Sequence, residues 1–231
     1  MTSPAAPTLG VIGLGSMGMG AALSALRNGV PTWGCDPRPE ARTAFEQAGG
    51  RAVASAAELA PHCDVVLVLV VNAAQTEDVL FGAQGVASSL KRGGVVVCSA
   101  TVDPALPPVW EQRLRETGHW LIDGPVSGGA KKAAAGQMTV MASGLPEAFA
   151  AAGNVLDAFA GKVYRLGEKA GIGSTVKMVN QHLAGVHIAT ACEAMALGMR
   201  AGAEPRQLYE VICNSAGMSW MFENRVPHIL D

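Results

Sequence analysis

Three short segments carry the residues that could do chemistry on a small molecule. The first is the turn Gly13-Leu14-Gly15-Ser16-Met17-Gly18, which follows an apolar run and precedes a proline-free segment rich in alanine and leucine. In such a GxGxxG turn, the first glycine permits the tight bend, the second lets the backbone approach a pyrophosphate, and the third allows close helix packing. The amides and dipole of the following helix favour phosphates. The turn predicts a dinucleotide site, although glycine-rich turns also occur without a ligand.

Asp36 strengthens this prediction because it lies 23 residues after Gly13, at the end of a second apolar run. A carboxylate there accepts hydrogen bonds from the adenosine ribose and disfavours a 2′-phosphate. Arg38 could pair with such a phosphate, so we expect NAD to be preferred over NADP but NADP not to be excluded. The alternative is that Asp36 caps a helix, since Asp-Pro pairs are common in turns.

The second segment runs from Gly171 to Gln181 and holds a polar cluster on a predicted helix. Because residues three and four apart are neighbours on a helix, one stripe should hold Gly173, Lys177, Asn180, Gln181 and Ala184. A lysine beside amides could hold and protonate a carbonyl oxygen. The alternative is that Lys177 extends from an interface into solvent while Asn180 and Gln181 bond each other or water. The helix taken alone favours this alternative.

The third segment is the loop Ser127-Gly128-Gly129, where a hydroxyl lies beside backbone amides that no side chain shields. Successive free amides of this kind form a nest for a carboxylate. An ordinary glycine-rich turn is the competing interpretation, and the loop alone does not separate the two.

The elements that must position these segments form an α/β pattern. Several apolar runs do not alternate with polar residues, as in VVLVLVV, which is typical of strands covered on both faces by helices. We therefore predict a Rossmann-type, doubly wound, mostly parallel sheet in a dinucleotide-binding domain over residues 1–170. Its expected strands are Leu9–Ile12, Val30–Cys35, Arg51–Ala54, Asp64–Val71, Gly94–Ser99, Trp120–Asp123, Met138–Ala142 and Lys162–Leu166.

Residues 171–231 predict an all-α domain that begins with a long helix from Gly171 to Gly202. Shorter helical segments follow over 206–214 and 218–231. Sixty-one residues in two or three helices make a marginal core by themselves. We expect this domain to be incomplete, and its apolar seam to pair in a homo-oligomer, either a dimer or a tetramer.

Composition excludes several classes of function. Seventeen basic and nineteen acidic residues give a net charge of −2, which offers no cationic surface for nucleic acid or an anionic membrane. The longest apolar run has seven residues, far fewer than the roughly 20 that span a bilayer. The five cysteines and five histidines lack metal-binding spacing, so we expect no metal site and a cytoplasmic protein with reduced thiols.

The motifs GLGSMG, DGPVSGGAKKAAAG at 123–136 and GIGSTVKMVNQ at 171–181 occur in one order along the chain. Together they resemble the β-hydroxyacid dehydrogenase family, which includes 3-hydroxyisobutyrate dehydrogenase and tartronate semialdehyde reductase. The stretch from Val176 to Met195 and SWMFENR at 219–225 are most similar to the L-threonate dehydrogenase branch. The resemblance covers nearly the whole chain, but relatives continue with further helices beyond residue 231.

The resemblance implies roles for individual residues. It places the pyrophosphate at Gly13–Gly18, the adenosine ribose at Asp36, and the rest of the cofactor near Val70, Val71 and Thr101. The substrate carboxylate falls to Ser127, Gly128 and Gly129, further substrate contacts to Asn180 and Gln181, and general acid–base catalysis to Lys177. Val70-Val71 replaces a leucine-proline pair of the family, Ala100 replaces a serine before Thr101, Ser174 stands for a common glutamine, and Gln181 for an asparagine.

These assignments predict an NAD-dependent enzyme that oxidises the secondary hydroxyl of a small hydroxy acid, and L-threonate, giving a 2-oxo acid, is the expected substrate. The other substrates considered are 3-hydroxyisobutyrate and tartronate semialdehyde. In two further alternatives the chain is not an active enzyme: it is either a dinucleotide-binding protein without turnover or an inactive fragment. The presence of Lys177 and Asn180 argues against the first.

Overall fold

The computed structural model describes residues 7–230, so the first six residues and Asp231, which the expected domains include, lie outside the described residues. By their internal contacts, the residues form two units, Met1–Lys177 and Met178–Asp231. The domain boundary expected after residue 170 stays a prediction. Among the described residues, no helix is long and apolar enough to cross a membrane.

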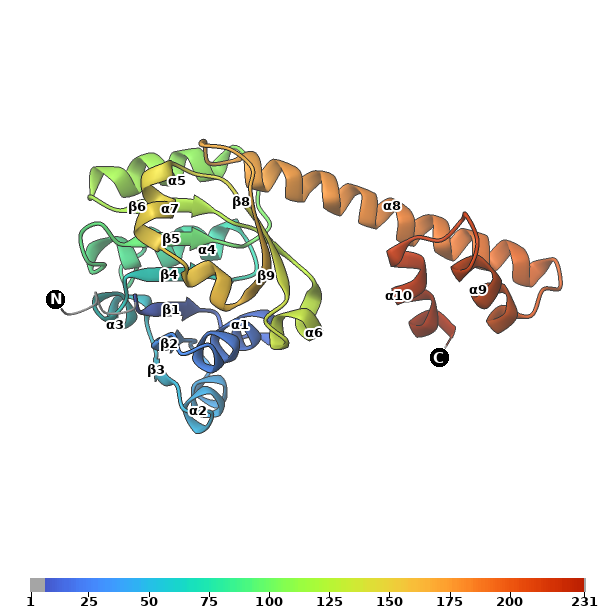
Figure 1. The fold of residues 1–231 in the computed structure, drawn as a ribbon, viewed down its shortest axis with the longest axis horizontal. Helices are drawn as coiled ribbons and strands as arrows, with labels where there is room; N and C mark the ends of the chain where they lie inside the picture. The colour runs from blue at the N-terminus through green and yellow to red at the C-terminus, as the bar shows by residue number, and fades with distance from the viewer. Residues whose placement is uncertain (1–6, 231) are drawn as a thin grey trace. The chain divides into compact units, whose positions relative to one another are not determined.

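The first unit is built on six parallel strands, which confirms the predicted Rossmann-type fold (Figure 1). Their spatial order is β3-β2-β1-β4-β5-β6, so the chain reverses its direction of travel between the neighbours β1 and β4. In sheets of this kind ligands bind beyond the carboxyl ends of the strands at this switch point. The strands are β1 (Leu9–Ile12), β2 (Thr32–Cys35), β3 (Arg51–Val53), β4 (Val65–Val68), β5 (Val95–Cys98) and β6 (Trp120–Asp123).

Helices cover both faces of this sheet and explain the apolar runs that do not alternate. In β4, Val65 and Leu67 point into one hydrophobic cluster while Val66 and Val68 point into the other. Both faces are therefore buried, and every position of the strand is apolar. The helices are α1 (Ser16–Arg27), α2 (Pro39–Gln47), α3 (Ala56–Leu59), α4 (Ala73–Phe81), α5 (Leu106–Glu116), α6 (Gly129–Ala134) and α7 (Pro146–Ala152).

Two expected strands, Met138–Ala142 and Lys162–Leu166, lie in a second, three-stranded sheet. The sequence pattern had not separated this sheet from the large one. The second sheet consists of β7 (Val126–Ser127), β8 (Met138–Ala142) and β9 (Ala160–Arg165), with β7 antiparallel and β9 parallel to β8. Only Gly124 and Pro125 separate β6 from β7. A parallel neighbour needs a crossover of about a dozen residues or more, so the chain leaves the first sheet here.

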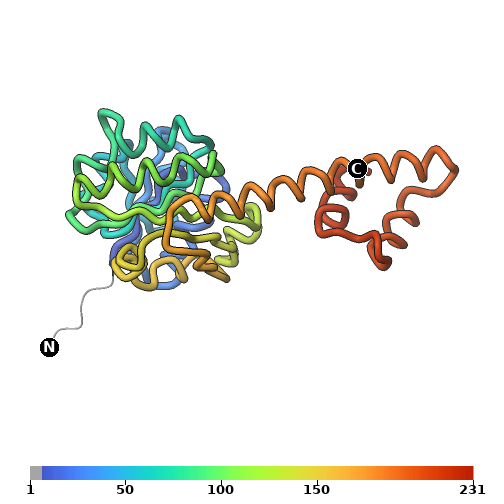
Figure 2. Tube along the Cα trace, turned by 90° about the horizontal axis from the view of Figure 1, so that it is seen from above, coloured from blue at the N-terminus to red at the C-terminus, as the bar shows by residue number. Residues whose placement is uncertain are grey.

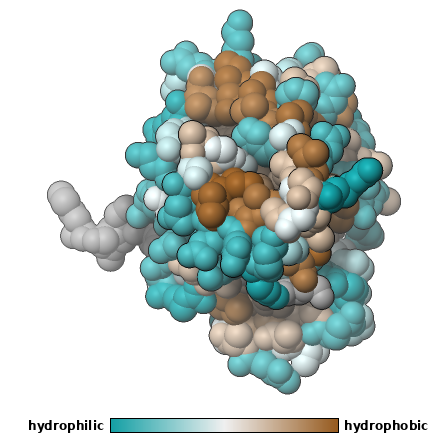
Figure 3. Space-filling model, turned by 90° about the vertical axis from the view of Figure 1, so that its right-hand side faces the viewer, coloured by the Kyte–Doolittle hydropathy of each residue, from teal (hydrophilic) through white to brown (hydrophobic). Residues whose placement is uncertain are grey.

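The predicted long helix is confirmed as α8 (Ile172–Arg200), which has 29 residues. Figure 2 draws it as one continuous helix. It is followed by α9 (Pro205–Cys213) and α10 (Trp220–Leu230). The helical unit has a small core whose buried members are Ala191, Met195, Phe222 and Val226. Large apolar side chains also reach the surface there, and Figure 3 shows hydrophobic patches among polar residues. The exposed ones include Leu197, Met199, Val211, Met218, Trp220 and Ile229.

Candidate functional site

The glycine turn between β1 and α1 gives each glycine a different physical task. Gly13 has φ +94°, and a Cβ on it would lie 2.5 Å from the carbonyl oxygen of Leu69. A Cβ on Gly18 would lie 1.7 Å from the carbonyl oxygen of Gly13, so this glycine brings the helix close to the turn. A Cβ on Gly15 would meet nothing within 4 Å. The space left open at Gly15 and the free amides at the start of α1 suit a bound pyrophosphate.

Two adjoining hollows lie along the carboxyl edge of the large sheet. One, of about 340 Å³, is lined by the glycine turn and by residues that follow β4 and β5: Gly15–Gly18, Leu69–Val71, Ser99–Thr101 and Val126. The other, of about 760 Å³, shares Gly15 and Leu69–Val71 with it and extends past Asp36 and Arg38. Because they share these residues, the two hollows form one cleft along this edge. Of the expected cofactor residues only Leu14 lines neither hollow, because its side chain is buried in the core.

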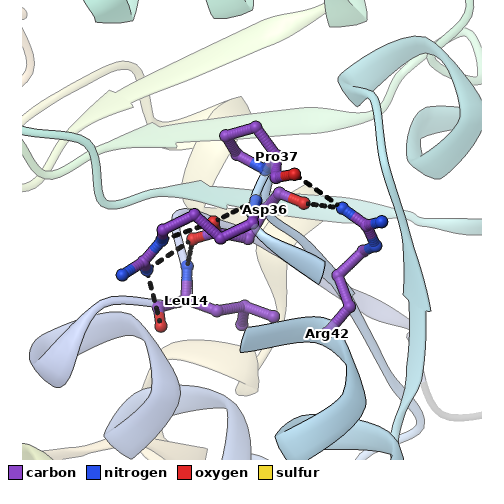
Figure 4. A network of polar contacts seen from close by, with 5 residues as sticks. Leu14, Asp36, Pro37 and Arg42 are labelled. Carbon is purple, nitrogen blue, oxygen red and sulfur yellow. Dashed lines mark hydrogen bonds and ion pairs between the residues drawn. The ribbon is translucent and has the colours of Figure 1, made fainter. Parts of the chain in front are cut away.

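Asp36 lies at the carboxyl end of β2 and is almost fully enclosed by hydrogen-bond donors (Figure 4). One carboxylate oxygen accepts from the backbone amide and Nε of Arg38, at 3.0 and 2.9 Å. The other accepts from the amide of Leu14 at 2.8 Å and from Nη2 of Arg38 at 3.0 Å. Burial acts to raise the pKa of Asp36, but the hydrogen bonds from Arg38 and Leu14 outweigh it and hold the pKa below its usual range. Asp36 is therefore ionised at neutral pH.

Arg38, which could pair with a 2′-phosphate, forms an ion pair with Asp36 in this structure. Its side chain remains 54% exposed, and its backbone precedes the first residue of α2. Asp36 thus lies three residues before the first residue of α2 and accepts the amide of Arg38 while also lining the cleft. The N-cap of α2 is Arg38 and no side chain of the described residues caps that helix, so Asp36 does not act as the helix cap, and its role as a ribose ligand stays a prediction. Arg42 donates to the carbonyl oxygens of Asp36 and Pro37 and fixes the turn (Figure 4).

The loop Ser127-Gly128-Gly129 is held against the helix that follows the glycine turn. Gly128 and Gly129 have φ +131° and +70°, which are values that favour glycine. Gly20 of α1 approaches α6 so closely that a Cβ on it would lie 2.7 Å from the backbone of Ala133. This packing ties the proposed carboxylate loop to the proposed phosphate helix. Of the neighbouring residues, Val126 lines the first hollow, whereas Ser127–Gly129 do not.

Lys177 is buried, with 7% of its surface exposed. No hydrogen bond or ion pair joins its ammonium to another residue in the described part of the chain. Burial lowers the pKa of Lys177, because an apolar environment disfavours the charged form. A lower pKa increases the fraction of neutral amine at a given pH, which favours a lysine as a base. The burial of Lys177 contradicts the alternative in which its amine extends into solvent.

Asn180 and Gln181 belong to the second unit, where Asn180 Nδ2 donates to Gln181 Oε1 at 3.4 Å. Asn180 is half-buried and Gln181 is exposed. The alternative in which these amides have no role in substrate binding predicts this contact between them. The roles proposed for both amides in substrate binding stay predictions.

Sequence reasoning missed one residue at the site, Asp123. It lies at the end of β6, immediately before the turn that leads to Ser127, and it accepts hydrogen bonds from the start of α8. A polar residue at the carboxyl end of an otherwise apolar strand, as in WLID, was the available signal. Its partners Ser143 and Ser174 could not have been inferred from spacing, because they are 20 and 51 residues away.

Comparisons with known proteins agree with this geometry. A family model for the NAD binding domain of 6-phosphogluconate dehydrogenase matches residues 8–167. A second model, described as NAD-binding of NADP-dependent 3-hydroxyisobutyrate dehydrogenase, matches residues 171–231. Both models concern dinucleotide-dependent dehydrogenases, so the chain contains NAD(P)-binding regions.

Individual relatives cover almost all of the chain. An L-threonate dehydrogenase of Cupriavidus necator is 59% identical over 96% of this chain and 75% of its own length. The human mitochondrial 3-hydroxyisobutyrate dehydrogenase is 32% identical over 96% of this chain and 67% of its own. A Salmonella typhimurium crystal structure described as 3-hydroxyisobutyrate dehydrogenase is 50% identical, covers 97% of this chain and 78% of its own, and superimposes with a TM-score of 0.91.

The open space at Gly15 generates a prediction. Gly15→Val should keep the melting temperature of the wild type, because a Cβ at this position meets no atom within 4 Å. It should weaken NADH binding by at least about tenfold, which is 1.4 kcal/mol. Fluorescence titration and thermal melting measure the two effects. Gly18→Val is the contrasting variant and should destabilise the fold, because its Cβ overlaps a backbone oxygen. Undiminished NADH affinity in Gly15→Val would contradict the assignment.

Proposed function

Because this chain belongs to the β-hydroxyacid dehydrogenase family, we propose that it oxidises L-threonate at C2 to a 2-oxo acid and uses NAD as the hydride acceptor. The reaction class, dehydrogenation of a hydroxy acid, belongs to the family as a whole. The observation that carries the substrate is the identity to relatives named L-threonate dehydrogenase, which is 50–59%, against 31–32% for relatives named 3-hydroxyisobutyrate dehydrogenase. The Salmonella structure keeps 3-hydroxyisobutyrate as the competing substrate.

Lys177 is the general acid–base group of the proposed reaction. The bound nicotinamide supplies the hydride acceptor. In the oxidation direction the neutral amine of Lys177 accepts the hydroxyl proton and later releases it to solvent, while the C–H bond gives its electron pair as hydride. Its burial lowers the pKa of Lys177 and so raises the fraction of neutral amine available at a given pH. In reduction the ammonium donates the same proton to the carbonyl oxygen.

Substrate recognition combines a carboxylate site with amides. We assign the substrate carboxylate to the hydroxyl of Ser127 and the amides of Gly128 and Gly129, whose positive φ values turn the backbone into a nest. Asn180 follows Lys177 by one helical turn on α8 and, with Gln181, supplies donors and acceptors for further hydroxyls. A polyol acid satisfies these amides, whereas a methyl group leaves them unpaired.

The cofactor is proposed to be NAD in preference to NADP. The carboxylate of Asp36 lines the larger hollow, where its charge disfavours a 2′-phosphate, and it accepts from ribose hydroxyls when the side chain of Arg38 gives up its contacts. Arg38 already uses its guanidinium on Asp36 and must leave that pair before it can bind a phosphate.

We also propose that the protein forms a homo-oligomer, because the helical unit buries few apolar residues. We propose a cytoplasmic location, because all five cysteines are free thiols.

A panel of hydroxy acids tests the substrate. NADH formation from L-threonate, D-threonate, 3-hydroxyisobutyrate and glycerate should be fastest with L-threonate. The hydroxyls of a polyol acid pair with the amides, which disfavours 3-hydroxyisobutyrate, and the L configuration follows from the relatives named L-threonate dehydrogenase. Highest kcat/KM on 3-hydroxyisobutyrate would overturn the branch assignment. Tight NADH binding without turnover of any acid would favour the dinucleotide-binding protein.

The cofactor preference has its own measurement. With L-threonate held saturating, kcat/KM for NAD should exceed that for NADP by about tenfold or more, equivalent to 1.4 kcal/mol or more of discrimination. Asp36→Ala should shrink this ratio, because it removes the charge that repels the phosphate. A tenfold preference for NADP in the wild-type protein would refute the role of Asp36.

Replacing the proposed base separates catalysis from binding. Lys177→Ala should lower turnover by on the order of 10² to 10⁴, the range expected for loss of a general acid or base. NADH affinity should change little, since Lys177 lines neither hollow of the cleft. Lys169→Ala is a matched control, because Lys169 is exposed and lies just before α8. Wild-type turnover in Lys177→Ala would dismiss the acid–base role.

A further inference from the structure

The carboxylate of Asp123 is the most enclosed charge near the start of α8. Its residue is 1% exposed, and its Oδ2 accepts from the amides of Gly171 and Ser174 at 2.9 and 2.8 Å. Oδ1 accepts from Ser174 Oγ at 2.6 Å, and the hydroxyl of Ser143 donates to Oδ2 at 3.3 Å. Among the described residues no lysine or arginine forms an ion pair with it. Burial raises the pKa of Asp123, while these hydrogen bonds from backbone amides and hydroxyls act in the opposite direction and stabilise the carboxylate.

Ser143 completes the attachment of the helix. Its Oγ accepts from the amide of Gly173 at 2.9 Å, so the amides of Gly171, Gly173 and Ser174 all have partners outside α8. Asp123 and Ser143 also exchange backbone hydrogen bonds of 2.9 and 2.8 Å, which join the ends of the two sheets. The start of α8 is thus bonded to the joint between the sheets.

Gly173 shows how close this attachment is. A Cβ on Gly173 would lie 2.3 Å from the carbonyl oxygen of Met141 and 2.6 Å from that of Asp123. Any side chain would push the helix away from the sheets. With three amides bonded and one face in backbone contact, α8 can neither rotate about its axis nor slide along it without breaking these bonds.

Asp123 is linked both to Lys177 and to the loop at Ser127. Lys177 follows Ser174 by three residues and Gly173 by four, so its direction is set by the rotation of the helix start. Asp123 itself precedes Ser127 by four residues through Gly124, whose carbonyl oxygen accepts from Ser99 Oγ at 2.7 Å. Ser99 lines the first hollow.

We propose that Asp123 is a positioning residue, whose carboxylate sets the rotation of α8 and thereby the place of Lys177 relative to the loop at Ser127. This inference rests on the proposed function for its kinetic part. Asp123 itself touches neither substrate nor cofactor. A misplacement of reacting groups by about 1 Å can cost on the order of 10²-fold in rate, so a fixed helix start has a direct kinetic value.

Asp123→Ala tests the proposal, because it removes every side-chain acceptor at once. We expect kcat to fall by on the order of 10²-fold, a smaller change in KM, and NADH affinity close to wild type. Asp123→Asn should recover much of the loss, since its amide oxygen can accept at the Oδ2 position and its nitrogen can donate to Ser174 Oγ. Ser174→Ala removes one donor and should give an intermediate loss, and it serves if Asp123→Ala does not fold.

A double-mutant cycle with Lys177→Ala separates positioning from general stability. If Asp123 acts through Lys177, Asp123→Ala should cost far less in the Lys177→Ala background than in the wild type. Equal factors in both backgrounds would overturn the proposal. Asp64→Ala is the matched control, because Asp64 also accepts a backbone amide, from Thr8, but lies at the opposite edge of the sheet. It should lower the melting temperature and leave kcat unchanged.

A second readout does not require turnover. Acetylation of lysines by acetic anhydride, followed by mass spectrometry, reports how accessible the buried Lys177 is relative to the exposed Lys169. Asp123→Ala and Ser174→Ala should raise the labelling of Lys177 relative to Lys169, and Asp64→Ala should not. Unchanged labelling of Lys177 would overturn the proposal. If no hydroxy acid is oxidised by the wild-type protein, the proposed function fails while this measurement still decides the inference.

Discussion

A parallel sheet imposes the constraint on which the site depends: all six strands end at one edge. The chain therefore returns to the same place after β1, β2, β4, β5 and β6, although those strand ends span more than a hundred residues of sequence. The glycine turn, Asp36, Leu69, Ser99 and Asp123 meet there for this reason alone. The glycine turn contributes exposed backbone, Asp36 a charge and Ser99 a hydroxyl. Leu69 lines the cleft, and Asp123 holds the start of α8.

The glycine turn and Asp36 could be located from the sequence alone, because their conformations depend on residues that are close in sequence. A glycine turn between an apolar run and a helix determines its own conformation, and Asp36 follows at the next strand end. Gly13 and Gly18 have the steric reasons that the motif predicts, and Gly15 faces open space. The strands covered on both faces were likewise visible in Val65–Val68, although the run continues to Val71 and the strand does not.

The remaining features depend on contacts between distant residues, which no pattern encodes. The second sheet arises because two residues after β6 are too few for another crossover. The hydrogen bonds that hold α8 link Asp123, Ser143 and Ser174 across 20 and 51 residues. The sequence showed that Arg38 could pair with a phosphate, but not that its guanidinium fork pairs with the carboxylate two residues away. Burial of Lys177 depends on how the first turn of α8 lies against the sheets, whereas its spacing could show only a stripe.

The central claim is that a buried, neutral amine takes a proton from an alcohol while the neighbouring carbon gives up hydride. The most direct test is the single-turnover rate of NADH formation from L-threonate with hydrogen or deuterium at C2, measured between pH 7 and 10. Because burial lowers the pKa of Lys177, we predict a rate that rises with pH, with a midpoint below the value near 10.4 of a free lysine, and slower transfer of deuterium. A rate that is flat with pH and insensitive to deuterium would contradict the account.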